Sequence, residues 1–336
     1  MSPIRFGILG AARIAPAAAV RPAAHIAEVE VTAVAARDPQ RATAFAHKHG
    51  IPKVAPSYEA LIDDPEIDAI YNPLPNALHA EWTLAAIAAG KHVLCEKPFT
   101  ANTAEAEQVA EAASGTGLVV MEAFHYRYHP FARRVANIIE NQELGKLRRV
   151  DTAMCFPLPK ASDIRFQLAL AGGATMDAGC YAIHMARLLG NEEPEVVTAS
   201  AKLQSEQVDR AMTAEVRFPS GTTGTITASM WSSSVLRITG RAWGDRGRLT
   251  MLNPIVPQYG HGLVVTVDGR RRLERFTRRH TYDFQMEAFC AAVLRGEPVL
   301  TPLSDSIANM RVIDDVYRAA GLRPRGPLGP DPVDGS

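Results

Sequence analysis

The sequence predicts an α/β protein of two domains, the first built on a doubly wound parallel sheet of the Rossmann type. The chain has 336 residues, more than one ordinary domain of roughly 100–200 residues holds. Its first 125 residues alternate short β-branched runs with alanine-rich stretches, which is typical of βαβ units. After Gly145, long segments of alternating polar and apolar residues follow with few helices between them, which indicates a mainly antiparallel sheet.

The expected parallel strands are residues 4–9, 29–36, 69–72, 92–95 and 118–121. Small and apolar residues at helical spacing predict helices over residues 38–49, 76–89 and 103–113. Asp38 and Asn102 are the expected N-terminal caps, and Gly50 and Gly90 the expected C-terminal stops.

The second half predicts strands over residues 147–156, 195–203, 209–218 and 222–230, with helices over residues 281–294 and 304–320. Ser220-Gly221 and Asp268-Gly269 are expected hairpin turns. From Arg323 the chain is rich in proline and glycine, which predicts disorder. The expected boundaries are therefore 1–125 for the first domain, 126–322 for the second and 323–336 for a disordered tail.

Composition excludes several functional classes. The 36 basic and 36 acidic side chains balance, so bulk charge does not recruit nucleic acid, and Arg270 to Arg272 are interpreted as a solvated strand end. Apolar stretches such as residues 85–89 are far shorter than the roughly 18–20 residues of a membrane span, and no signal peptide is recognised. Four scattered cysteines without a CxxC pair predict reduced thiols, no metal site and a cytoplasmic protein.

A candidate phosphate loop follows the first strand directly, where a dinucleotide pyrophosphate meets a helix N-terminus. Gly10 holds the tight-turn position, whereas Ala12 and Ala15 replace the second and third glycines of the usual fingerprint. Alone, this degraded pattern fits an ordinary turn equally well, and its place after the first strand favours the cofactor loop. The expected cofactor contacts here are Gly10, Ala11, Ala12, Arg13 and Ile14.

The end of the second strand predicts which cofactor is used. NAD-specific enzymes often place an acid there to bind the ribose 2′-hydroxyl, but this strand ends in Ala36 and Arg37. Arg37 and Arg41 are cations suited to a 2′-phosphate. Asp38 is better explained as a helix cap. The sequence therefore favours NADP(H) over NAD(H).

Two further segments bring polar residues to the ends of parallel strands, which face the ligand crevice. An apolar strand ends in Glu96, Lys97 and Pro98, for which a surface ion pair is the alternative interpretation. The preceding strand leads into further expected cofactor contacts: Pro73, Leu74, Asn76 and His79. A core or capping histidine is the alternative for His79.

A glycine-rich turn at Gly172-Gly173 opens a third segment that carries candidate catalytic residues. Asp177, Tyr181 and His184 follow at i, i+4 and i+7, so they share one face of a helix.

Together these segments resemble the glucose-fructose oxidoreductase / inositol dehydrogenase / rhizopine catabolism (Gfo/Idh/MocA) superfamily, over nearly all of residues 1–322. They are most similar to its branch of dimeric dihydrodiol dehydrogenases and NADP-dependent xylose dehydrogenases. The resemblance implies a large open-faced, mainly antiparallel sheet in the C-terminal α/β domain, which in many relatives forms the dimer interface. It also implies that Lys97 and Tyr181 lie near the reacting hydroxyl, with Asp177 beside them.

The expected chemistry is hydride transfer at a carbinol carbon, which requires a proton to move on its oxygen. Tyr181 is the expected acid/base, and a nearby Lys97 ammonium is expected to lower its pKa from about 10. Lys97 itself is the alternative proton donor. Asp177 is expected to orient Lys97 or a substrate hydroxyl. Further expected substrate contacts are Phe156, Arg165 and His184.

These residues predict an oxidoreductase that uses NADP(H) on an uncharged sugar, polyol or cyclic vicinal diol, with no nucleic-acid or membrane partner. A cofactor-sensing regulator without turnover is one alternative, although it would not need both Lys97 and Tyr181. An NAD-dependent glycosidase of the same superfamily is another. An open sheet face with apolar side chains in water further predicts a homodimer or larger homo-oligomer.

Overall fold

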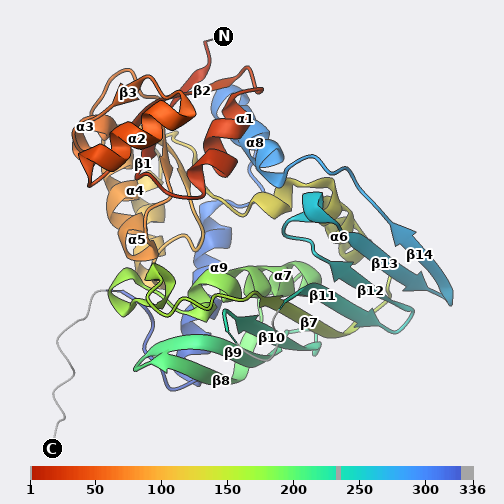
Figure 1. The fold of residues 1–336 in the computed structure, drawn as a ribbon. Coiled ribbons are helices and arrows are strands. Elements are labelled where there is room, and N and C mark those ends of the chain that lie inside the picture. The colour runs from red at the N-terminus through yellow and green to blue at the C-terminus, as the bar shows by residue number, and fades with distance from the viewer. Residues whose placement is uncertain (1, 232–235, 327–336) are drawn as a thin grey trace, which may run out of the picture.

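The computed structural model describes residues 2–231 and 236–326, and Figure 1 shows two sheets with helices packed around them. The first sheet has six parallel strands in the order β3-β2-β1-β4-β5-β6. The strands are β1 (Ile4–Leu9), β2 (Val29–Ala35), β3 (Lys53–Val54), β4 (Ala69–Asn72), β5 (His92–Cys95) and β6 (Val120–Glu122). Strand order reverses between β1 and β4, so the ligand crevice lies beyond their carboxyl ends. The predicted Rossmann-type sheet is confirmed.

The helices of this half are α1 (Arg21–Ala23), α2 (Pro39–His49), α3 (Tyr58–Ile62), α4 (His79–Ala88) and α5 (Thr103–Ala113). Capping side chains begin three of them, α2, α3 and α5. Asp38 accepts hydrogen bonds from the backbone N–H groups of Gln40 and Arg41, and Asn102 accepts one from Glu105. The single helix expected over residues 76–89 is instead a 3₁₀ turn, Asn76–Leu78, followed by α4. The short β3 and α3 were not expected, because two to five residues show no periodicity.

The second sheet has eight strands in the order β14-β13-β12-β11-β7-β10-β9-β8. The strands are β7 (Leu147–Cys155), β8 (Glu195–Ser205), β9 (Val208–Arg217), β10 (Thr223–Ser229), β11 (Arg237–Gly244), β12 (Gly247–Leu252), β13 (Gly262–Val267) and β14 (Arg270–Glu274). Neighbours are antiparallel except β7 and β10, which are parallel. At the β13–β14 hairpin, Asp268 and Gly269 have φ of 48° and 75°, as a type I′ turn requires.

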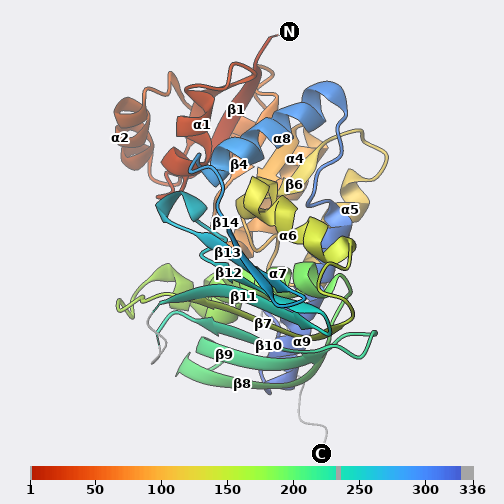
Figure 2. The same ribbon diagram turned by 90° about the vertical axis from the view of Figure 1, so that its right-hand side faces the viewer.

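Helices from the second half of the chain join the two sheets. They are α6 (Pro130–Glu140), α7 (Cys180–Gly190), α8 (Thr281–Arg295) and α9 (Leu303–Ala319). Figure 2 shows α7 between the second sheet and the Rossmann half, with α8 lying against the Rossmann half. The rings of Phe6 in β1 and Phe289 in α8 are 5.3 Å apart at their centroids. Elements beyond residue 125 therefore contribute to the core of both halves.

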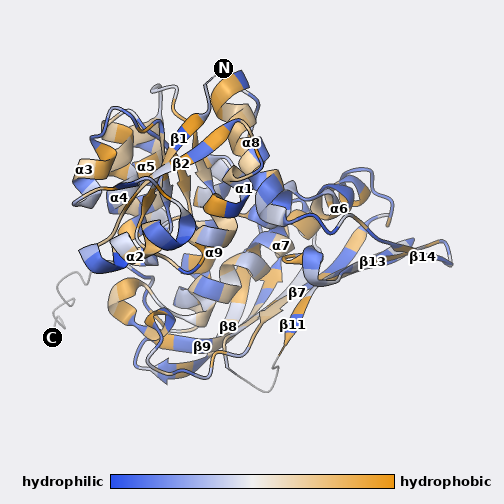
Figure 3. Cartoon of the chain, turned by 45° about the horizontal axis from the view of Figure 1, so that its top comes forward, coloured by the Kyte–Doolittle hydropathy of each residue, from blue (hydrophilic) through white to orange (hydrophobic). Residues whose placement is uncertain are grey.

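Hydrophobic residues concentrate where these layers meet. Strands β1 and β4 are buried along almost their whole length, and part of β1 is orange in the hydropathy colouring of Figure 3. Strand β10 instead alternates, because Ile226 and Ala228 are buried while Thr225 and Thr227 are partly exposed. Ala228 faces the turn before α7, since a Cβ at Gly179 would lie 3.4 Å from the Ala228 Cβ. Thr225 and Thr227 therefore belong to the opposite, helix-free face of the sheet.

The centre of this open face is polar. In register with Thr225 and Thr227 lie Asp151 of β7 and, on β9, Glu215 and Thr213. Large exposed apolar side chains on the sheet are Val197, Leu203, Leu252 and Leu273, on strands away from its centre. The alternation of polar and apolar residues predicted a sheet with two unlike faces. Which face lies against the helices is decided by tertiary packing.

The expected disordered tail does not begin at Arg323. Arg325 is 3% exposed, and its guanidinium pairs with Asp209 at 3.2 Å and donates to the Gly172 carbonyl. Tyr317 of α9 stacks under Arg325 and donates to the same Asp209. These contacts hold residues 323–326 against the second sheet, and residues 327–336 lie outside the described part of the chain.

Candidate active site

The glycine loop after β1 is shaped for a close approach to a ligand. Gly10 has φ of 83°, and its N–H donates to the Ala35 carbonyl of β2. A Cβ at Gly10 would lie 3.1 Å from the Leu74 side chain, so glycine suits this position in both conformation and space. The helix that follows starts irregularly, as a π-helical turn, Pro16–Val20, before α1. The cradle at Gly10 fits the pyrophosphate of a dinucleotide.

At the end of β2, the structure separates Arg37 from Asp38. The Asp38 carboxylate accepts the N–H groups at the start of α2, and no described carboxylate pairs with the exposed Arg37 or Arg41. Both cations are therefore available for a 2′-phosphate, as the sequence predicted for NADP(H).

The expected cofactor contacts Asn76 and His79 both bind backbone carbonyls of nearby loops. His79 is buried, and its two ring nitrogens lie 2.8 Å from the Pro98 carbonyl and 2.7 Å from the Leu74 carbonyl. Asn76 donates its amide to the Ala171 carbonyl. Both residues therefore hold the loops at Pro73-Leu74 and Pro98 in place, and His79 has no free ring nitrogen for the cofactor. Burial lowers the pKa of His79 to about 4.

The Glu96-Lys97 pair at the end of β5 is not a surface ion pair. Glu96 is buried and accepts a hydrogen bond from the Tyr71 hydroxyl at 2.8 Å. The Lys97 ammonium donates instead to Asp177, reaching the carboxylate at 2.9 Å and the backbone carbonyl at 3.1 Å. Burial alone would lower the pKa of Lys97, but the Asp177 carboxylate raises it above its ordinary value. Lys97 is thus a charged donor held by a residue from the other half of the chain.

Two more charged residues extend this pair. Arg165 lies 3.5 Å from the second Asp177 oxygen and 2.9 Å from Asp163. Burial would raise the pKa of Asp177, but Lys97 and Arg165 together lower it. Phe156 lies under Arg165, with 5.9 Å between the guanidinium carbon and the ring centroid. The expected substrate contacts Phe156 and Arg165 therefore adjoin the Lys97–Asp177 pair.

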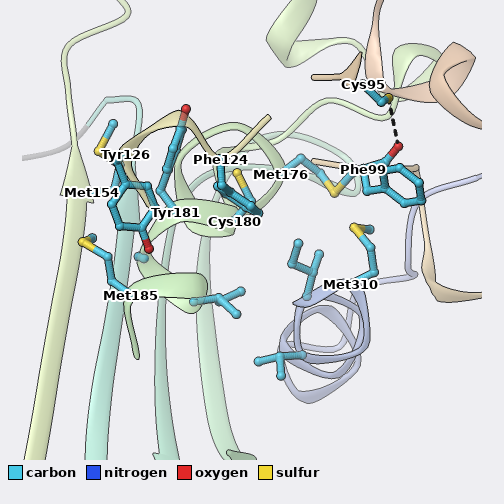
Figure 4. Close-up of a cluster of buried hydrophobic side chains, with 14 of the residues drawn as sticks. Cys95, Phe99, Phe124, Tyr126, Met154, Met176, Cys180, Tyr181, Met185 and Met310 are labelled. Atoms are coloured by element: carbon cyan, nitrogen blue, oxygen red, sulfur yellow. Dashed lines mark hydrogen bonds between the residues drawn. The ribbon is translucent and has the colours of Figure 1, made fainter. Parts of the chain in front are cut away.

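Tyr181 lies beside Lys97, whose ammonium is 5.1 Å from the centre of the tyrosine ring. Figure 4 shows Tyr181 packed with Phe124, Tyr126 and Cys180. Burial raises the pKa of Tyr181 well above its usual value, which corrects the expectation that Lys97 would lower it. The reason is geometric, because Lys97 lies over the ring and does not donate to the hydroxyl. Tyr181 is therefore a neutral phenol.

His184, an expected substrate contact, has protein partners at both ring nitrogens. It is buried against the ring of Phe124, with Nδ1 2.7 Å from the Tyr126 hydroxyl and Nε2 2.9 Å from the Asp305 carboxylate. Both ring nitrogens are engaged, so His184 ties α7 to the start of α9. Burial lowers its pKa to about 4.

Sequence reasoning missed His125, whose Nε2 lies 3.1 Å from the Tyr181 hydroxyl, and Asp163. His125 stands between two aromatic residues, Phe124 and Tyr126. Nothing in the spacing linked it to a residue 56 positions away. A polar residue inside an apolar run after a parallel strand was the available signal.

Comparison with known proteins identifies the family. The model "Oxidoreductase family, NAD-binding Rossmann fold" matches residues 4–124, and the "GFO/IDH/MocA C-terminal domain" model matches residues 132–250. The chain belongs to the Gfo/Idh/MocA oxidoreductase family. It is an oxidoreductase, and NADP(H) is its cofactor.

Named members of the Gfo/Idh/MocA family resemble the chain over most of its length. D-xylose 1-dehydrogenase (NADP(+)) 2 of Haloferax volcanii is 39% identical, covering 94% of this chain and 97% of the relative. Trans-1,2-dihydrobenzene-1,2-diol dehydrogenase of Sus scrofa is 34% identical, covering 68% of this chain and 67% of the relative. A 3-ketoreductase from Actinomadura kijaniata, solved with NADP and TDP-benzene, is 31% identical, covers 96% and 99%, and superposes with a TM-score of 0.87.

No helix within residues 2–231 and 236–326 is both long and apolar enough to cross a membrane. No group of three histidine, cysteine or acidic side chains there is arranged to hold a metal ion.

Proposed function

We propose that this Gfo/Idh/MocA enzyme transfers hydride between NADP(H) and a carbinol or carbonyl carbon of an uncharged sugar, polyol or cyclic vicinal diol. The observation that carries the proposal is the charged Lys97 held by Asp177 beside the neutral phenol of Tyr181. The named relatives act on xylose and on a cyclic diol, which supports this substrate class.

Lys97 and Tyr181 have different roles at the substrate oxygen. When bound, the nicotinamide of NADP(H) supplies or accepts the hydride. A lysine ammonium has three N–H donors, and Lys97 directs two of them to Asp177, which leaves one for the substrate oxygen. That charged donor stabilises negative charge on the oxygen as the carbonyl is reduced. Tyr181 is the proton donor in this proposal, because its hydroxyl is protonated and Lys97 stays charged beside Asp177.

The cofactor and substrate contacts are assigned from the same geometry. The Gly10–Ile14 loop, Pro73 and Leu74 would hold the pyrophosphate and nicotinamide ends, with Arg37 and Arg41 at the 2′-phosphate. Arg165, Asp163 and Phe156 would bind the substrate's remaining hydroxyls. The Asp163 pKa is lowered mainly by Arg165 and also by Arg13 of the glycine loop, so cofactor and substrate residues share one electrostatic network.

We also propose that the enzyme works in the cytoplasm as a homodimer. Its four cysteines are buried and free, as in proteins of a reducing compartment. Figure 1 shows helices on one face of the eight-stranded sheet, so its other face is available to a second copy. Interfaces between proteins are often as polar as the rest of the surface, so the threonine-rich face is compatible with pairing.

An activity screen tests the proposed reaction. NADP reduction is measured with aldoses, polyols and cyclic diols, and NADPH oxidation with ketosugars and dicarbonyls. Lys97→Met and Tyr181→Phe are expected each to lower kcat by about 10²–10⁴, the usual effect of a lost acid/base group, with NADP(H) affinity unchanged. Their losses are expected not to multiply in the double variant, because the two residues act on one oxygen.

Matched substitutions provide the control. Lys202→Met on β8 and Tyr259→Phe change exposed residues outside the site and are expected to keep wild-type rates. Full activity in Lys97→Met, or a preference for phosphorylated sugars, would contradict the proposed function.

A further inference from the structure

A buried chain of hydrogen bonds reaches the Tyr181 hydroxyl. The His125 Nε2 lies 3.1 Å from the Tyr181 hydroxyl, and its Nδ1 lies 2.8 Å from the hydroxyl of Thr281. Exposed fractions are 5% for Tyr181, 2% for His125 and 0% for Thr281. The three residues come from α7, the 3₁₀ turn His125–Tyr128 and the first position of α8.

Two effects set the protonation state of His125. Burial, and then the charge of Lys97, lower its pKa to about 3, so the ring is neutral at working pH. Tyr282 packs on the ring with centroids 4.2 Å apart, and it is also neutral because burial raises its pKa. A neutral imidazole carries one N–H, so His125 can donate to Tyr181 or to Thr281, but not to both.

Thr281 decides between these two tautomers. Among the described residues, its hydroxyl has one hydrogen-bond partner, His125 Nδ1. If Nδ1 carried the proton, the Thr281 hydroxyl, which is 0% exposed, would have no acceptor, at a cost of about 1–3 kcal/mol. If Nε2 carries it, the hydroxyl proton left over is that of Tyr181, which the substrate oxygen of the proposed reaction can accept. Thr281 therefore donates to Nδ1, and the ring proton lies on Nε2. His125 then donates to the Tyr181 oxygen.

We propose that Thr281 and His125 are positioning residues that direct the Tyr181 hydroxyl proton away from the protein and toward the substrate oxygen. This inference rests on the proposed function, in which Tyr181 is the proton donor. When Tyr181 gives its proton to the substrate oxygen in the reductive direction, the phenolate that remains accepts the His125 Nε2–H. The chain thus orients the acid before the step and stabilises its conjugate base after it.

Substitutions at Thr281 test the tautomer. Thr281→Val keeps the shape but removes the donor, so the imidazole proton can move to Nδ1 and Tyr181 can turn its proton toward His125. We expect kcat in the reductive direction to fall by about tenfold or more, with KM, NADPH affinity and thermal midpoint little changed. The solvent deuterium isotope effect on kcat is expected to rise. Thr281→Ser, which keeps the hydroxyl, is expected to retain activity.

A second pair of variants tests His125 independently of Thr281. Gln has an amide donor that can replace Nε2–H, so His125→Gln is expected to keep much more activity than His125→Leu. Thr301→Val is the matched control, because Thr301 is a buried threonine whose hydroxyl meets the Tyr128 hydroxyl outside the site. It is expected to leave kcat and the isotope effect unchanged.

Measurements in the Tyr181→Phe variant distinguish a failure of the proposed function from a failure of this inference alone. If Tyr181→Phe is impaired and Thr281→Val has no further effect in that background, the chain acts through Tyr181, as proposed. Full activity of Tyr181→Phe would reject Tyr181 as the donor and with it the proposed mechanism. An impaired Tyr181→Phe together with wild-type rates and isotope effects in both Thr281→Val and His125→Leu would overturn this inference alone.

Discussion

Arg37 and Asp38 are adjacent, yet their side chains have different roles. Asp38 is held by the backbone N–H groups that begin α2, so its charge is committed to the helix. Arg37 is exposed and has no described acidic partner. The same distinction between committed and available groups applies to the histidines, since His79 and His184 each have two partners. At the scale of single residues, hydrogen-bond partners decide which polar groups can meet a ligand.

Substitution of Arg37 tests its part in cofactor choice. The wild-type enzyme is expected to bind NADP(H) at least tenfold more tightly than NAD(H), a difference of about 1.4 kcal/mol. Arg37→Asp is expected to remove this preference by repelling the 2′-phosphate, with little change for NAD(H). Calorimetric titration of both cofactors measures it. Arg133→Asp makes the same charge change at an exposed site on α6 and should have no effect; equal affinities in the wild type would reject the assignment.

Among the elements, the eight-stranded sheet has two unlike faces. One receives α7, and the Thr152 hydroxyl donates to the Ala182 carbonyl where strand and helix meet. The other presents Thr225, Thr227 and their neighbours on β7 and β9. A helix-free face with a threonine-rich centre is suited to pairing with a copy of itself about a twofold axis.

Light scattering at micromolar concentration tests the assembly, and a dimeric or larger mass is expected. Thr227 lies near the centre of the open face, so Thr227→Arg is expected to place two like charges near the axis and shift the mass toward the monomer. Gln108→Arg on the exposed side of α5 adds the same charge elsewhere and should leave the mass unchanged. A monomeric wild type would reject the proposed dimer.

For the whole molecule, the contact between α9 and the Rossmann sheet contains a buried acid. Glu122 at the end of β6 is 1% exposed, and burial raises its pKa to about 8, against the opposing effect of the Ser306 hydroxyl on α9. The unfolded chain loses this proton near pH 4.5, whereas the folded protein keeps it until about pH 8. Folding stability therefore decreases as pH rises through this interval, because the unfolded state is the one that ionises.

Glu122→Gln removes this penalty. Relative to the wild type, the variant is expected to gain free energy of unfolding as pH rises from 4.5 to 8, by roughly 3–5 kcal/mol in total, and to gain no more above pH 8. Urea denaturation at several pH values measures the difference. Glu140→Gln, at an exposed position on α6, should show no such trend. A difference independent of pH would show that Glu122 ionises normally in the folded protein.

Local pattern determined much of this protein. The parallel strands, the caps at Asp38 and Asn102 and the hairpin at Asp268-Gly269 follow from residues within a few positions of one another. The charges that end β5 could be assigned to the crevice because parallel strands always point their carboxyl ends to one edge. Strands β11 and β12 were not predicted, nor was the parallel pairing of β7 with β10, which are joined by a long connection.

Tertiary structure alone decided how the polar groups pair. Lys97 meets Asp177 across 80 positions, His125 meets Tyr181 across 56, and Arg325 meets Asp209 across 116. Spacing along the chain carries no record of such contacts, because they depend on how separate elements pack. The pKa of Tyr181 rises for the same reason, since it depends on burial and on which atom of the ring Lys97 approaches. The sequence determined which residues reach the crevice, and packing determined their charge, partners and proton positions.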